Sequence, residues 1–120
     1  MPRAGLILSA GDSVAFEPFD REAQFRESRG RPLPELLDEF ATLRAANLQQ
    51  LEAMHLSEAD LEKRGRHPAL GSVTLRQLLA TWVAHDCDHL MQVARIIGSQ
   101  YADEVGPWSS YLRVISGQQG

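Results

Sequence analysis

Apolar residues recur at helical spacing in two stretches of the chain, and the second stretch carries the stronger pattern. Thr74, followed by Gln77 three residues later, has the signature of a capping box, and neither Gly nor Pro interrupts the chain before Gly98. We therefore predict a helix over about 74–97. One face of it repeats at steps of four and three residues, as a helix packed against a neighbour does, through Leu78, Trp82, His85, His89, Gln92 and Ile96.

The first stretch begins at Pro34, which suits the first position of a helix because its missing N–H costs nothing there. Its apolar positions keep helical spacing and predict a helix over about 34–54: Leu36, Leu37, Phe40, Leu43, Leu48, Leu51 and Met54.

Between these two helices, Ser57 and Asp60 resemble a capping box and predict a short helix to about Lys63. His67 precedes Pro68, and a residue before proline disfavours helical dihedral angles. We place His67 in a loop and expect its side chain to be hydrogen-bonded to backbone.

Residues 1–32 show no sustained period and are interrupted by Gly and Pro. We predict at most one turn of helix near Leu6, a short helix over 20–26, and otherwise a connecting arm whose anchors are Phe16, Phe19 and Phe25. No segment alternates as a strand does, so the predicted class is all-α, with an arm at 1–32 and a helical body at 33–120 of a single domain.

Composition narrows the classes of function. The chain has 120 residues, enough for one core, with 43% hydrophobic residues and a net charge of -4. Its 11 Arg and one Lys are scattered among acids, so we expect no nucleic-acid partner. We see neither a leader nor a run long enough to cross a bilayer, and expect a cytoplasmic protein without membrane contact. The single Cys87 excludes an internal disulfide, and we read it as a small packing residue.

The pair His85 and His89 is the candidate for chemistry. Residues four apart stand on one helix face, so both imidazoles can point at a common metal ion. The alternative from spacing alone is a pair of hydrogen-bonded core histidines. A zincin-type peptidase helix would use Asp86 as the carboxylate after the first histidine, but no downstream histidine exists to serve as a third ligand.

A resemblance begins at these residues and extends over essentially the whole chain. The sequence resembles the DinB-like (DinB/YfiT) family. The matching segments are GRHP at 65–68, GSVTLRQLLATWVAHD at 71–86, His89, Gln92, AR at 94–95, QY at 100–101, VGPW at 105–108, YL at 111–112, FEPFDR at 16–21, LLDEF at 36–40 and LRA at 43–45.

This resemblance implies a four-helix bundle with a divalent metal, commonly zinc or nickel, held by three histidines. On it, His85 and His89 are the second and third ligands. Similar proteins include thiol-dependent transferases and isomerases that use a low-molecular-weight thiol, and others described as metal-dependent hydrolases. The implied activity is transfer or hydrolysis of a small-molecule substrate, in which the metal activates a thiol or water.

The first ligand of that family lies on an earlier helix, and this chain looks as if it starts near the close of that helix. We therefore expect an antiparallel hairpin of helices 34–54 and 74–97, weakened activity, and completion of the bundle as a homodimer. Each site would then have two histidines and water, with Asp88 or a partner residue as a third ligand. The alternative is one closed site shared by two pairs of histidines.

Two further residues complete the predicted site. Gln92 lies one turn beyond His89 and is the candidate for orienting water or substrate, unless it is an amide at a helix interface. Asp86, the other candidate catalytic residue, or Asp88 would orient a ligand's second N–H, unless it is only a solvated charge of the helix. The non-enzymatic alternative is an inactive helical dimerisation remnant without metal.

Overall fold

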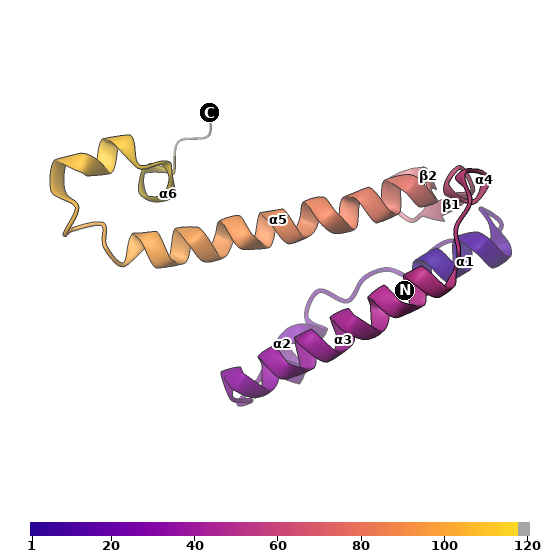
Figure 1. The fold of residues 1–120 in the computed structure, drawn as a ribbon, viewed down its shortest axis with the longest axis horizontal. Helices are drawn as coiled ribbons and strands as arrows, with labels where there is room; N and C mark the ends of the chain where they lie inside the picture. Colours follow the sequence, from indigo (N-terminus) through magenta and orange to yellow (C-terminus); the bar gives the residue numbers. More distant parts are fainter. Residues whose placement is uncertain (118–120) are drawn as a thin grey trace. The chain divides into compact units, whose positions relative to one another are not determined.

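The computed structural model describes residues 1–117 and is mostly helical (Figure 1). Two compact units divide the chain, Met1–Leu78 and Leu79–Gly120, which we call unit 1 and unit 2. No helix within residues 1–117 combines the length and apolar character needed to cross a membrane. The predicted division into an arm and a helical body, and the pairing of the two long helices as a hairpin, stay predictions.

Unit 1 contains the helices α1 (Pro2–Ala10), α2 (Ala23–Ser28), α3 (Leu33–Ala53) and α4 (Glu58–Leu61). The predicted helix 34–54 is confirmed as α3, and the short helices near 20–26 and 57–63 are found as α2 and α4 with shifted bounds. The expectation of a single turn near Leu6 was wrong, since α1 has 9 residues. Proline in its first turn favours this helix, and burial of one face stabilises it.

A two-stranded antiparallel sheet also lies in unit 1 and corrects the all-α prediction. Strand β1 (Arg64–His67) pairs with β2 (Gly71–Thr74) from the Arg64–Thr74 pair to the His67–Gly71 pair. The residues of these strands, RGRH and GSVT, do not alternate between apolar and polar side chains, which is why the sequence did not reveal them. His67 therefore ends a strand and does not lie in a loop.

The core of unit 1 is small and joins α1 to β1. Phe16 donates its backbone N–H to the Arg66 carbonyl at 2.9 Å, and this places its ring beside α1. Gly65 in β1 faces the Ile7 and Phe16 side chains. Of the three predicted aromatic anchors only Phe16 is buried, because Phe19 and Phe25 lie outside this contact and stay exposed. The buried side chains of the core are Ala4, Ile7, Phe16 and Leu75.

The turn between β1 and β2 is closed by the His67 side chain. His67 Nδ1 accepts backbone N–H bonds from Ala69 at 3.1 Å and Leu70 at 3.2 Å. Its ring also lies edge-on to Phe16, with the centroids 6.2 Å apart. The predicted hydrogen bonding of His67 to backbone is thus confirmed, although the predicted loop is not.

Substituting His67 by Phe should loosen this turn while keeping the ring. Because the two backbone donors are exposed and water can replace the lost acceptor, we expect a loss of about 0.5–1.5 kcal/mol in unfolding free energy. Urea unfolding of the whole chain followed by circular dichroism measures the loss. His67→Asn is the matched control, since its side-chain oxygen can accept from the same turn. Equal unfolding midpoints for His67→Phe and the native chain would contradict the assignment.

Unit 2 contains most of the second long helix, α5 (Leu75–Ser99), whose first residues belong to unit 1. The predicted helix 74–97 is confirmed. A six-residue 3-10 helix, η1 (Gly106–Tyr111), and α6 (Arg113–Ser116) follow it. Gly98 lies so close to Val114 that an added Cβ would be 2.9 Å from Val114 Cγ2, so α6 packs against the end of α5.

Candidate metal site

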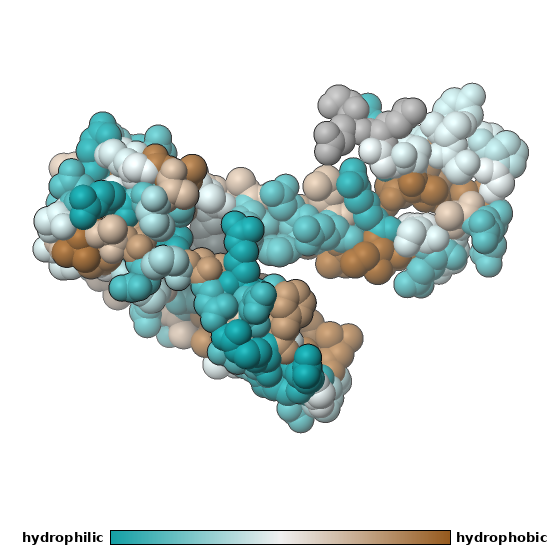
Figure 2. All heavy atoms as spheres, turned by 180° about the vertical axis from the view of Figure 1, so that it is seen from behind, coloured by the Kyte–Doolittle hydropathy of each residue, from teal (hydrophilic) through white to brown (hydrophobic). Residues whose placement is uncertain are grey.

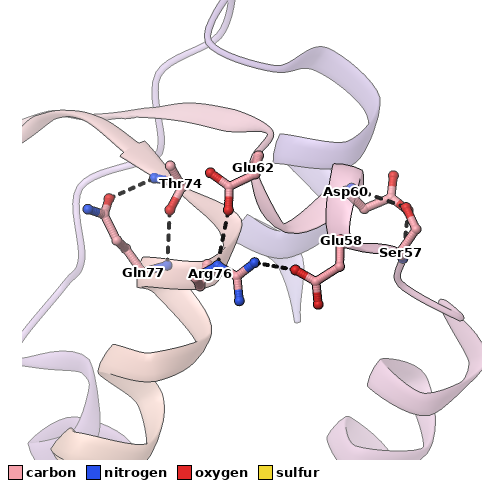
Figure 3. Close-up of polar contacts among 7 residues, drawn as sticks. All are labelled: Ser57, Glu58, Asp60, Glu62, Thr74, Arg76 and Gln77. Atoms are coloured by element: carbon pink, nitrogen blue, oxygen red, sulfur yellow. Dashed lines mark hydrogen bonds and ion pairs between the residues drawn. The ribbon is translucent and has the colours of Figure 1, made fainter.

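The start of α5 is fixed by a capping box and by an ion-pair cluster (Figure 3). Thr74 donates its backbone N–H to Gln77 Oε1 at 2.9 Å, and Gln77 returns its backbone N–H to Thr74 Oγ1 at 3.1 Å. These two bonds satisfy donors that the first turn of a helix leaves unpaired. The capping box predicted from the sequence is therefore confirmed, and α5 runs from it without interruption through the two histidines.

The ion-pair cluster joins α4 to the first turn of α5, and the sequence did not reveal it. Arg76 donates from Nη2 to Glu58 at 2.6 Å and from Nε to Glu62 at 3.0 Å (Figure 3). These two carboxylates, that of Glu58 first, raise the pKa of the Arg76 guanidinium. Both partners lie far from Arg76 in sequence, so no local spacing could have indicated the contacts.

α4 has its own capping box, which the sequence predicted. Asp60 accepts the Ser57 backbone N–H at 3.0 Å and returns its own backbone N–H to Ser57 Oγ at 3.2 Å. The Lys63 ammonium, 2.7 Å from the Asp60 carboxylate, and the Ser57 hydroxyl hold the pKa of Asp60 well below its usual range. The Asp60 carboxylate is therefore charged at neutral pH. A negative charge in the first turn stabilises a helix.

His85 and His89 lie one turn apart on α5 with their rings in contact. The ring centroids are 4.4 Å apart and the ring planes are nearly perpendicular, at 88°. Both side chains are exposed in the single chain, and their place on a packed helix face stays a prediction. Helical periodicity marks the face on which residues lie, but it does not show whether another element covers that face.

The hydrogen bond of His89 is made to Gln92, one turn further along α5. Gln92 Oε1 lies 3.0 Å from His89 Nδ1. If the oxygen accepts, the proton is on Nδ1 and Nε2 keeps its lone pair. The sequence placed Gln92 beside the pair but did not show that it contacts a histidine, because a spacing of three residues does not fix the side-chain rotamer.

The three residues that follow His85 differ in their exposure to solvent. Asp86 is half-buried, whereas Asp88 is exposed. Cys87 is also exposed, which contradicts its reading as a packing residue. It lies about 200° around the helix from His85.

The imidazoles of His85 and His89 are chemically suitable ligands for a divalent metal ion, but they are fewer than the three histidines that the resemblance implies. Two imidazoles in contact, one turn apart, can share one cation. Among residues 1–117, however, no three His, Cys, Asp or Glu side chains gather into a group that could hold a metal ion. Within that part of the chain, the structure brings two candidate ligands, His85 and His89, into contact.

The other two histidines and one hollow in unit 1 have different surroundings from the His85–His89 pair. His67 Nδ1 is used by the hairpin turn, and His55 is an exposed residue with a positive φ of 44° after α3. A hollow of about 660 Å³ in unit 1 is lined mainly by apolar residues. Its Asp20 carboxylate is engaged by Arg26, which lowers the pKa of Asp20, and its Arg3 donates to the Glu17 carbonyl.

Comparison with known protein families gives a match over most of the chain. The sequence profile of the DinB superfamily matches residues 3–93, a range that includes most of α1, both capping boxes, His85, His89 and Gln92. A search of curated proteins finds no significant match.

Proposed function

The chain belongs to the DinB superfamily, and on this premise we propose that it binds a divalent metal ion through His85 and His89 and acts as a metal-dependent transferase or hydrolase. The observation that supports the proposal is the contact between the two imidazoles, whose centroids lie 4.4 Å apart on one helix. Neutral imidazoles are common ligands of zinc and nickel, which are the metals we expect.

When bound, such a cation favours the deprotonated form of a thiol or water at neutral pH and so supplies a nucleophile for a small electrophilic substrate. The residues of this chain position the reactants. His85 and His89 present their ring nitrogens on one helix face, and both are accessible from solvent. We assign Asp86, next to His85, to proton transfer or to orienting a ligand's second N–H. A low-molecular-weight thiol is the co-substrate in the transferase form of the proposal.

Because no three metal donors gather among the described residues, we propose that the chain forms a homodimer. The surface exposes large apolar side chains, visible as brown spheres in Figure 2. A second copy that covered such a surface would bury apolar area, which stabilises association. It could also bring Asp88 or another histidine pair to the metal. The exposed apolar residues on the two long helices are Leu33, Leu37, Phe40, Leu43 and Leu48 on α3, and Val83, Leu90, Met91, Val93, Ile96 and Ile97 on α5.

One observation favours a second candidate function. Because the described residues contain no group of three metal donors, the chain fits an inactive helical dimerisation remnant as well. In that case His85 and His89 would be ordinary surface residues of α5.

Metal content separates the two candidates. We expect elemental analysis of untagged protein to give about one zinc or nickel per chain, with light scattering giving the mass of a dimer. A value of about half a metal per chain would indicate a closed site shared by four histidines. Protein that stays free of metal after incubation with either ion, while folded, would overturn the metal proposal in favour of the remnant. A sample treated with chelator and then reloaded serves as the control.

A further inference from the structure

Gln92, one turn beyond His89 on α5, contacts the Nδ1 nitrogen of the His89 ring. The 3.0 Å distance joins Gln92 Oε1 to His89 Nδ1, and the residues stand three apart, where helical side chains are neighbours. His85, one turn earlier, has its ring against His89. Gln92 is thus a hydrogen-bond partner of one of the two candidate ligands, His89.

The direction of this hydrogen bond determines which nitrogen of His89 can bind a metal. A neutral imidazole carries one proton, and the nitrogen without it holds the lone pair. When Gln92 Oε1 accepts, the proton is on Nδ1 and the lone pair is on Nε2, away from Gln92. A histidine that binds a metal through one nitrogen commonly donates its other N–H to an oxygen of this kind, which fixes the tautomer and the ring orientation.

We infer that Gln92 is a positioning residue that holds His89 in the tautomer protonated on Nδ1, so that Nε2 is presented to a cation. This goes beyond the role of orienting water or substrate suggested by the sequence, because Gln92 acts through His89. The inference about the tautomer stands on the geometry of the metal-free chain, whereas its use for binding rests on the proposed function.

The tautomer can be measured without metal. In nitrogen-15-labelled, metal-free protein, at a pH where imidazole is neutral, long-range proton–nitrogen spectra distinguish the two ring nitrogens. We expect His89 to be protonated mainly on Nδ1, and Gln92→Met to move the proton to Nε2, the form that free histidine favours in water. Gln92→Glu should restore the native pattern, because its carboxylate accepts from the same position. Gln, Met and Glu all favour helices, so α5 should persist in each variant.

Gln100→Met is the matched control, because it removes an exposed amide just beyond α5 and should leave the spectrum of His89 unchanged. Zinc titration adds a second readout, in which Gln92→Met should bind about tenfold more weakly than the native chain and Gln92→Glu should recover the affinity. A native His89 protonated on Nε2, or a tautomer unchanged in Gln92→Met, would overturn the inference. If the tautomer behaves as expected but native protein takes up no metal, the positioning role stands and the metal proposal fails.

Discussion

Replacing both His85 and His89 by Ala is expected to abolish stoichiometric binding of zinc or nickel. The two imidazoles are metal donors that the structure places in contact. Each single substitution should lower the metal affinity by more than the about 10–100-fold that follows loss of a residue hydrogen-bonded to a ligand. Equilibrium dialysis followed by elemental analysis measures the loss. Alanine has the highest helix propensity, so the double variant should keep its helical circular dichroism.

The matched control for this experiment is His55→Asn. His55 is an exposed histidine outside the pair, and asparagine tolerates its positive φ of 44° better than most residues. This variant should bind as much metal as the native chain. Retention of about one metal per chain in the double His85 and His89 variant would refute the site assignment, whereas loss in His55→Asn would place a ligand elsewhere.

Substituting Gly65 by Ala is expected to destabilise the core of unit 1 strongly. The added Cβ would lie 2.6 Å from Ile7 Cγ1 and 2.8 Å from Phe16 Cζ, closer than real Cβ contacts come. Ile7 is 1% exposed and Phe16 is 2% exposed, so neither side chain can swing into solvent. Overpacking of this kind typically costs about 1–3 kcal/mol, and urea unfolding of the whole chain measures it.

A second glycine provides the control for this prediction. Gly5 lies in α1, and an added Cβ there would meet nothing within 4 Å. Gly5→Ala should therefore stabilise the chain by about 0.5–1 kcal/mol, the usual gain for this change inside a helix. Combining Gly65→Ala with Ile7→Ala should cost less than the sum of the single changes, since the nearer of the two clashing atoms, Ile7 Cγ1, is gone. Equal unfolding midpoints for Gly65→Ala and Gly5→Ala would show that β1 does not pack on α1 in this way.

Local signals were enough to predict the long helices. The apolar periods of 34–54 and 74–97 and the two capping boxes each depend on residues within a turn of one another, and the structure confirms them in α3, α4 and α5. The spacing of His85 and His89 on α5 depends on the same periodicity. The resemblance to the DinB-like family is confirmed by the profile match over residues 3–93.

The small core of unit 1 could not be derived in this way. Phe16 packs on β1, and Gly65 leaves room for the Ile7 side chain, through contacts between residues 50 and 58 positions apart. The two strands carry no alternation of apolar and polar residues, and the sequence does not distinguish a glycine that makes room for neighbouring side chains from one that ends a helix. The sequence therefore did not reveal the β1–β2 hairpin or the length of α1. It also did not reveal that Phe16 is buried while Phe19 and Phe25 are exposed.

The sequence by itself determined that two imidazoles share one face of a long helix, because backbone periodicity fixes where side chains start. Only the tertiary structure decided that both rings are exposed and that His89 Nδ1 meets Gln92, because burial depends on what packs against a face and a hydrogen bond depends on rotamers. It also decided that Arg76 joins α5 to α4 through Glu58 and Glu62. Such contacts arise from side chains brought together by folding, and local spacing carries no record of them.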